Sequence, residues 1–156
     1  MNVCVARFGL IVVAGSLLGT SAFAQEAKIS EKAVPAAVLT AFKSAYPQAR
    51  IRGYAREKEN GKTFYEIESL DGTMHRDILY NPDGTVAEIE EGIAATDLPS
   101  EAQQTIQQKY PRAVVTIAEK VTTGDKVAYE VSAKRGKQRI SLEFDANGKI
   151  TKSKVR

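Results

Sequence analysis

Cysteine, histidine and tryptophan are scarce in this 156-residue sequence, which has one cysteine, one histidine and no tryptophan. One Cys and one His cannot supply a zinc or iron site built on soft ligands, and they give no secure Cys–His or Ser–His relay. With 43% hydrophobic and 26% charged residues, the chain has the composition of a folded domain. We therefore expect a globular protein with no cofactor and no metal, and most hydrolase chemistry is not expected.

Only one long hydrophobic run occurs, at residues 8–18, and it follows Arg7 and precedes Ala22-Phe23-Ala24. A short cationic start, an apolar run and an A-x-A site are typical of a cleaved signal peptide. The run is shorter than the roughly 20 residues that span a membrane comfortably. We predict that residues 1–24 are a signal peptide and that the mature chain starts at Gln25, is periplasmic or secreted, and has no stable membrane span. The alternative is an uncleaved amino-terminal anchor.

Charge is distributed unevenly along the mature chain. Residues 25–96 contain 9 Lys and Arg against 12 Asp and Glu, whereas residues 97–156 contain 12 against 7. The difference indicates a dipolar surface that orients a partner, or complementary packing between the halves, or a surface difference without a function. The basic end, 149–156, is typical of contact with nucleic acid or anionic membranes. Because exported proteins rarely meet nucleic acid, we expect no nucleic-acid partner.

The sequence repeats itself without gaps at an offset of 64 residues, as from Pro35 to Pro99. The matching segments are Tyr46-Pro47 and Tyr110-Pro111, Tyr65-Glu66-Ile67 and Tyr129-Glu130-Val131, and Asp83-Gly84 and Asn147-Gly148. A series this long indicates two tandem copies of one small unit. We place the first copy at residues 25–96 and the second at residues 97–156.

Each copy changes period once. Apolar residues first recur at helical spacing, over 34–45 and 98–110, and then alternate with polar residues as in strands. The first copy's strands are predicted at 49–56, 63–70, 74–80 and 85–91, separated by turns that contain Asn-Gly or Asp-Gly. We therefore predict an α+β fold in which each copy is one amphipathic helix packed on a four-stranded antiparallel β-meander.

Isolated polar residues have modest interpretations. Asp145-x-Asn147-Gly148 lacks the further carboxylates of a calcium loop and is read as a tight turn. His75 could be a pH-sensitive contact or a metal ligand, but no second histidine accompanies it, and neither role is expected. Glu66 and Glu130 occupy equivalent positions in the two copies, and we expect each to pair with a basic residue on a neighbouring strand.

The whole pattern resembles the PepSY-like, beta-lactamase-inhibitor-like family. The resemblance rests on the leader, the two helix-plus-meander copies, the Tyr-Pro-x-Ala segments and the Asp/Asn-Gly turns, and it extends over residues 34–150. It implies an exported binding module, with enzyme inhibition as one form of that binding. The inhibitor that gives the family its name has disulfides and an inhibitory loop, whereas this mature chain has no cysteine and no matching loop.

A binding face can be predicted from alternation in the first copy. If Ile51, Tyr65, Ile67, Ile78 and Tyr80 face the helix, the opposite face carries aromatic and basic residues, which are typical of binding hot spots. The predicted partner-binding residues on that face are Arg52, Tyr54, Arg56, Phe64 and Leu79. The alternative is that these rings pack against the other copy or a linker. One residue of slip in register would exchange the two faces.

These observations favour a non-enzymatic module that presents a β-sheet face to a protein or peptide in the cell envelope, with enzyme inhibition or regulation as one form of that binding. A periplasmic hydrolase that uses scattered carboxylates is the alternative from a different class, and it requires two acids close together. An envelope structural protein is the third.

Overall fold

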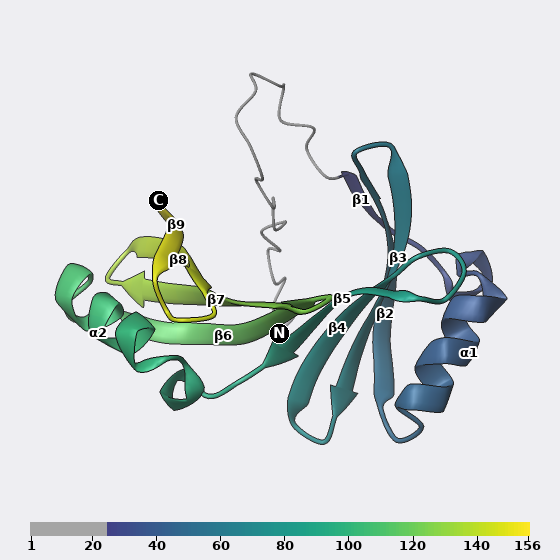
Figure 1. The fold of residues 1–156 in the computed structure, drawn as a ribbon, viewed down its shortest axis with the longest axis horizontal. Helices are drawn as coiled ribbons and strands as arrows, with labels where there is room; N and C mark the ends of the chain where they lie inside the picture. Colours follow the sequence, from purple (N-terminus) through teal and green to yellow (C-terminus); the bar gives the residue numbers. More distant parts are fainter. Residues whose placement is uncertain (1–24) are drawn as a thin grey trace.

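The structure is a computed structural model that describes residues 25–156, so the predicted signal peptide lies outside the described residues. The first copy contains β1 (Gln25–Lys28), η1 (Glu31–Ala33), α1 (Ala36–Ala45), β2 (Arg50–Glu59), β3 (Lys62–Asp71), β4 (Met74–Tyr80) and β5 (Val86–Gly92). After η2 (Ala95–Asp97), at the junction of the copies, the second contains α2 (Ser100–Lys109), β6 (Val114–Thr123), β7 (Lys126–Arg135), β8 (Gln138–Asp145) and β9 (Ile150–Val155). Figure 1 shows the order of these elements.

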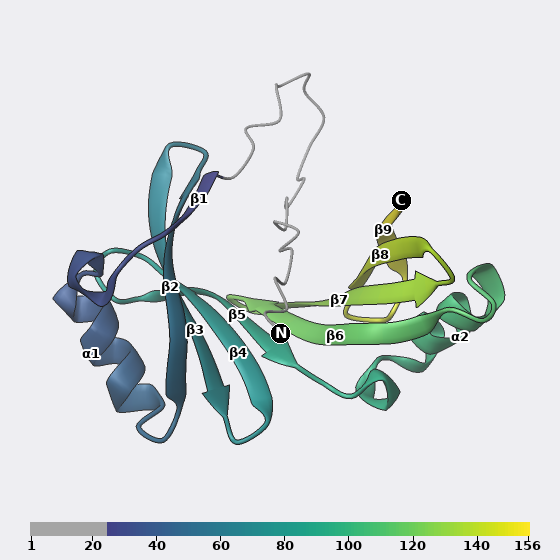
Figure 2. The same ribbon diagram turned by 180° about the vertical axis from the view of Figure 1, so that it is seen from behind.

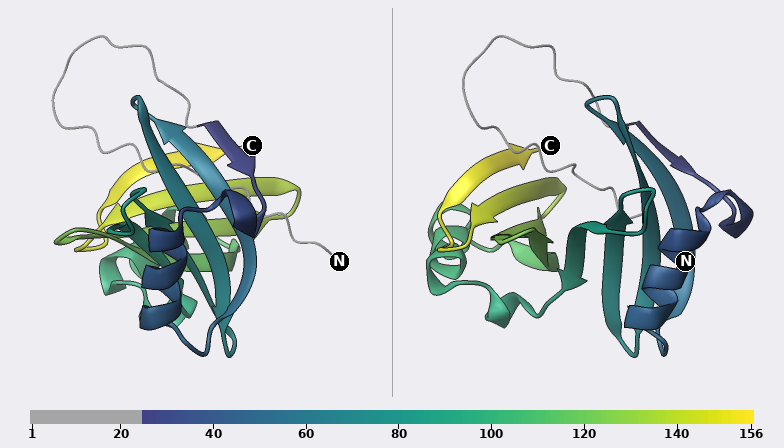
Figure 3. Two further views of the ribbon diagram at one scale, coloured as in Figure 1. Left: turned by 90° about the vertical axis from the view of Figure 1, so that its right-hand side faces the viewer. Right: turned by 45° about the vertical axis from the view of Figure 1, so that its right-hand side comes forward.

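All strands join one antiparallel nine-stranded sheet in chain order from β1 to β9. The predicted α+β class is therefore confirmed, but the two copies do not form separate sheets, because β5 pairs with β6. The strand β1 was also not predicted. Both helices pack on the same face of the sheet and lie near its opposite ends, outside a bend between the two halves (Figures 1 and 2). Figure 3 shows how strongly the sheet twists between them.

The two copies repeat each other in backbone detail. The residue after α1, Tyr46, has φ −130° and ψ 62°, and its counterpart after α2, Tyr110, has φ −128° and ψ 57°. Strand pairing also repeats at the 64-residue offset: Gln25 lies opposite Lys58, as Ile89 lies opposite Thr122. The strand β5 therefore has two roles, as the last strand of the first copy and as the strand that precedes the second helix.

Each helix covers its own hydrophobic core. Val38 and Phe42 of α1 are buried against Ile67, Ile78 and Tyr80 of the sheet. The second core repeats this arrangement with Ala102, Ile106, Val131, Leu142 and Phe144. The five residues predicted to face the first helix all belong to or pack against its core, so that prediction is confirmed.

The last hairpin of each copy packs directly on the start of its helix. Gly84 has φ +88°, and a Cβ built on it would lie 2.7 Å from the carbonyl oxygen of Ala37. Gly148 has φ +85°, and its Cβ would lie 2.7 Å from the amide nitrogen of Ala102. A glycine is required here both by the left-handed backbone and by the close contact.

Candidate functional site

The sheet face that carries no helix is the candidate site. Because side chains alternate along a strand, the register assigns each residue to the helix side or to this helix-free face. In the middle of the sheet, the helix-free face is dominated by carboxylates on neighbouring strands. We call this set the acidic face: Glu57, Glu66, Glu68, Asp77, Glu88, Glu90, Glu119, Glu130 and Glu143.

Several of these carboxylates lie directly opposite one another. Asp77 on β4 is opposite Glu68 on β3 and Glu90 on β5. Glu130 on β7 is opposite Glu119 on β6 and Glu143 on β8. Like charges at such positions repel and destabilise a sheet. The expectation that Glu130 pairs with a basic residue is therefore wrong, because carboxylates occupy the positions across from it on both sides.

Glu130 shows the electrostatic consequence most clearly. Burial, followed by the negative charge of neighbouring carboxylates, raises the pKa of Glu130 from its ordinary value of 4.5 to about 8. These neighbours are, in order of effect, Glu90, Glu143, Glu119 and Glu88. Its Oε1 atom is buried and has no hydrogen-bond partner among the described residues. At pH 7 Glu130 is therefore mostly protonated in the free protein.

Other members of the acidic face are also removed from solvent. Glu66 is 2% exposed, Glu90 5%, and Asp77 6%. His75 Nδ1 lies 3.5 Å from Asp77 Oδ1. At one margin of the face, Lys152 Nζ donates a hydrogen bond of 2.7 Å to Glu143 Oε1. Burial makes the attraction between these acids and an incoming cation stronger than it would be in water.

The five predicted partner-binding residues do not lie on one face. Phe64 and Leu79 lie on the helix-free face, opposite Glu57 and Glu66 respectively. Tyr54 lies opposite Ile67 and packs against the core under α1. The prediction that all five share one surface is therefore wrong, and Leu79 is itself only 8% exposed.

A β-bulge causes this difference. The register of β2 against β3 shifts between Ile51 and Gly53, so that Arg52 is an extra residue and the later residues change sides. Arg56 then lies opposite Tyr65 on the helix side. The second copy has the same shift between Val115 and Ile117. A pattern of strict alternation cannot show such an insertion.

Arg52 and Tyr54 line a groove beside the end of α1, with a volume of about 930 Å³. Burial, followed by the charge of Glu31 and a hydrogen bond to it, raises the pKa of Tyr54. A crevice of about 610 Å³ occupies the equivalent position in the second copy, between the segment before α2 and the bulge in β6. There His75 and Met74 of the first copy complete the wall.

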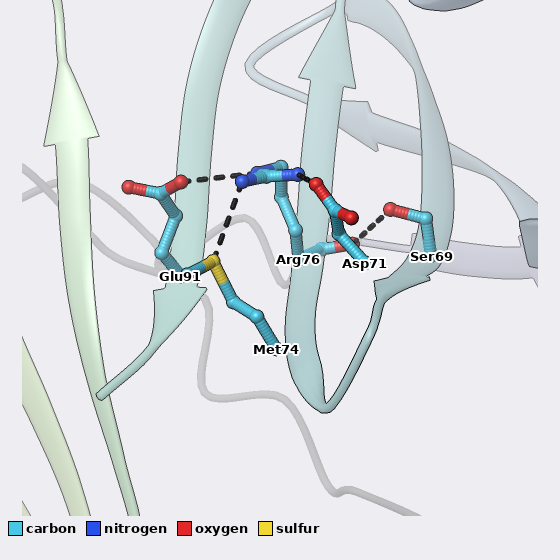
Figure 4. Close-up of polar contacts among 5 residues, drawn as sticks. All are labelled: Ser69, Asp71, Met74, Arg76 and Glu91. Carbon is cyan, nitrogen blue, oxygen red and sulfur yellow. Dashed lines mark hydrogen bonds and ion pairs between the residues drawn. The ribbon is translucent and has the colours of Figure 1, made fainter. Parts of the chain in front are cut away.

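Arg76 is a buried charge that the sequence patterns did not reveal. Its Nε atom donates a 3.0 Å hydrogen bond to Glu91, and one terminal nitrogen lies 3.7 Å from Asp71 (Figure 4). Its guanidinium also covers the ring of Tyr46 at 4.3 Å. In the second copy the same position is occupied by Ile140, which is buried. Comparison of the two copies in sequence would have shown this extra charge. Because Arg76 lies on the helix side of the sheet, it is not part of the acidic face.

Cation-binding groups are limited in the part of the chain that the structure describes. No group of three or more His, Cys, Asp or Glu side chains is arranged to hold a metal ion among residues 25–156. Asp145 Oδ1 accepts hydrogen bonds from the backbone amides of Asn147 and Lys149, so that the turn is closed by its own chain. Among the same residues, no helix has both the length and the apolar character needed to cross a membrane.

Solved structures share this fold at low sequence identity. A protein from Bacteroides eggerthii described as periplasmic is 13% identical, with a TM-score of 0.65 over 78% of this chain and 88% of that one. A DUF2874 family protein from Bacteroides uniformis is 15% identical, with a TM-score of 0.63 and the same coverage. A BLIP-like protein from Bacteroides fragilis is 17% identical, with a TM-score of 0.57 over 78% and 86%.

Sequence comparison gives the family. No curated protein matches the chain. The profile of the family described as beta-lactamase-inhibitor-like and PepSY-like matches residues 22–87 and 63–152, two overlapping copies that together extend over most of the sequence. The chain belongs to the beta-lactamase-inhibitor-like, PepSY-like family.

Proposed function

We propose that this protein is an exported, non-enzymatic binding module whose acidic face binds a basic segment of a protein or peptide in the cell envelope. The observation that carries the proposal is the row Glu119, Glu130 and Glu143, in which three carboxylates face one another across adjacent strands. Such a row is unfavourable in the free protein. Lysine or arginine side chains of a partner relieve this repulsion. The free energy that the repulsion costs the free protein is then recovered when the partner binds.

The shape and composition of the face support the same proposal. The helices lie on the outside of the bent sheet, so the acidic face lies on the inside of the bend with no helix over it (Figure 1). Phe64 adds a partly exposed aromatic side chain to it. An aromatic ring beside carboxylates suits a partner that presents both apolar and basic side chains.

Export and the form of binding rest on the leader and on the family. The expected signal peptide and the periplasmic description of the similar Bacteroides eggerthii protein support an envelope location. The family description and the BLIP-like neighbour support inhibition or regulation of an enzyme as the form that binding takes. The partner is then an enzyme that presents a basic segment.

A hydrolase is the second candidate, because the close acids that such an enzyme needs are present. Glu130 has a pKa of about 8, which suits a general acid at neutral pH, and other carboxylates surround it. An enzyme would turn over its ligand and lose activity in Glu130→Gln. A binding module would form a stable complex and release the ligand unchanged.

Capture from envelope extract, followed by measurement with the purified partner, tests the proposal. The exported protein is compared with the Glu119→Gln/Glu130→Gln variant and with Glu101→Gln/Asp125→Asn, which removes two exposed carboxylates from the α2 start and a hairpin turn. The proposal expects the first variant alone to lose at least about tenfold in affinity. Equal binding by all three folded proteins would contradict it.

A further inference from the structure

The two ends of the sheet are related to each other through the repeat. β1 pairs with β2 in the same register in which β5 pairs with β6, and β9 pairs with β8 as β5 pairs with β4. The shift between Leu79 and Tyr80 also recurs between Glu143 and Phe144. In the middle of the molecule one strand, β5, pairs both with β4 before it and with β6 after it. At the ends, these two pairings are made by different strands: β9 pairs with β8, and β1 pairs with β2.

This division leaves β9 with an outer edge that corresponds to the edge by which β5 binds β6. In the described sheet, β9 is the last strand and pairs with β8 alone. The matching acceptor is the edge of β2, which the four-residue strand β1 covers. An edge strand offers backbone donors and acceptors to another chain. The acceptor for β9 must belong to a second copy, because β2 and β9 lie near opposite ends of the sheet (Figure 1).

We propose that the protein assembles head to tail, with β9 of one copy taking the place of β1 on β2 of the next copy. Repeating the register of β5 on β6 sets Lys154 opposite Glu57, Ser153 opposite Lys58, and Val155 opposite Arg56. The sheet then continues from copy to copy. This contact is heterologous, so it produces open chains, or rings where the rotation closes, and not an isologous dimer.

Charge favours this exchange. In the single copy, Glu26 of β1 lies directly opposite Glu57, a like-charge pair that weakens the attachment of β1. After the exchange, Lys154 faces the same carboxylate. The opposite net charges of residues 25–96 and 97–156 also attract the β9 end of one copy toward the β2 end of another.

The lysines of β9 select between possible partners. Lysine on an edge strand commonly prevents edge-to-edge pairing. Two β9 strands would bring Lys152 and Lys154 of each copy close together, which disfavours a symmetric dimer through this edge. A second β9 strand would repel these lysines. The edge of β2 attracts them, because Glu57 lies on the same face.

Complementary charge reversals test the assembly. The full chain is expressed and exported, and the exported protein is analysed by sedimentation at low salt. The wild type is compared with the single variants Lys154→Glu and Glu57→Lys. We expect wild type to form oligomers that lengthen with concentration, and each variant alone to associate about tenfold more weakly. An equimolar mixture of the two variants restores association, because Lys154 of the Glu57→Lys variant again meets Glu57 of the Lys154→Glu variant, as in the wild type. Lys137→Glu, at an exposed turn, changes the charge equally and leaves association unchanged.

Two further variants distinguish the replacement of β1 by β9 from nonspecific charge attraction between copies and from misfolding. Glu26→Lys places lysine opposite Glu57, strengthens β1 and is expected to reduce assembly. Lys58→Cys/Ser153→Cys changes two exposed positions that would lie directly opposite each other, close enough for a disulfide between copies. We expect a ladder of linked species on oxidation, absent from Lys58→Cys/Lys137→Cys. A monomer at all concentrations, or no more linkage than in this control, would overturn the proposal.

Discussion

Glu130 on β7 lies directly opposite Glu143 on β8, and both carboxylates point away from the helices. Glu143 is neutralised in part by Lys152, at 2.7 Å, whereas Glu130 is held between Glu143 and Glu119. Burial, together with the negative charge of these and other neighbouring carboxylates, raises the pKa of Glu130 to about 8. In the free protein the bound proton neutralises Glu130, as the positive charge of the proposed partner would do in the complex.

Stability should fall between about pH 4.5 and pH 8 because of Glu130. Its folded pKa of about 8 exceeds the ordinary value of 4.5, so the native state binds one proton more than the unfolded state in this window. The favourable contribution is complete below pH 4.5 and is lost as the pH rises through 8. Glu130→Gln should reduce this dependence and stabilise the protein at pH 8 by about 1 to 3 kcal/mol. Urea unfolding at pH 5 and pH 8 measures both effects; an unchanged pH slope would contradict the assignment.

Tyr54 and Phe64 should respond differently to truncation, because they lie on opposite faces of the sheet. Tyr54→Ala removes a ring that packs on the core under α1, and we expect a loss of about 2 kcal/mol in the free energy of unfolding with unchanged partner binding. Phe64→Ala should lower partner affinity with a smaller loss of stability. Thermal unfolding and a binding titration on both variants measure the two effects. The reverse outcome would place the partner on the helix side.

The buried cluster around Arg76 should be replaceable only as a unit. Arg76→Ile alone leaves Glu91 without its 3.0 Å partner, and we expect a loss of about 3 kcal/mol. Adding Ser69→Ala and Glu91→Val reproduces Ala133, Ile140 and Val155 of the second copy.

The triple variant should recover most of the stability that Arg76→Ile loses, because it removes the polar groups together with their partner. Denaturant unfolding of the single and triple variants makes the comparison. A triple variant no more stable than Arg76→Ile would show that the cluster has a role that the second copy's packing cannot replace.

Gly84 should tolerate alanine much less well than Gly72. Both have positive φ, of +88° and +60°, but only the Cβ at position 84 would collide with backbone, at 2.7 Å from the Ala37 carbonyl oxygen. We expect Gly72→Ala to cost about 1 kcal/mol from backbone strain and Gly84→Ala about 3 kcal/mol from strain and displacement of α1. Equal losses in thermal unfolding would mean that the hairpin does not pack on the helix start as described.

Local signals in the sequence predicted much of the fold. The Asn60-Gly61 turn has φ of 49° and 76°, as the predicted hairpin requires, and the strand predicted at 74–80 has the bounds of β4. These features depend on a few neighbouring residues, so a short sequence pattern contains them. The 64-residue offset similarly predicted the structural repetition of the two copies.

Features that depend on pairing between distant strands were not predictable in the same way. Nothing in Arg52-Gly53 distinguishes a bulged strand from a regular one, and this single insertion moved Tyr54 and Arg56 to the helix side. The acidic face also escaped notice, because its members are scattered along the sequence and converge only when β5 joins β6. Glu66 and Glu130 were singled out from the repeat, but the carboxylates on both sides of Glu130 could not be identified without the register.

If the acidic face exchanges the proton of Glu130 for a cationic partner, calorimetry of partner binding at pH 7 in buffers of different ionisation enthalpy detects that exchange. Because a bound lysine or arginine lowers the pKa of Glu130, we expect up to one proton to be released per complex and the affinity to rise from pH 6 to pH 8. Glu130→Gln should abolish this proton release. Proton release that persists in Glu130→Gln, or affinity independent of pH in the wild type, would contradict the account.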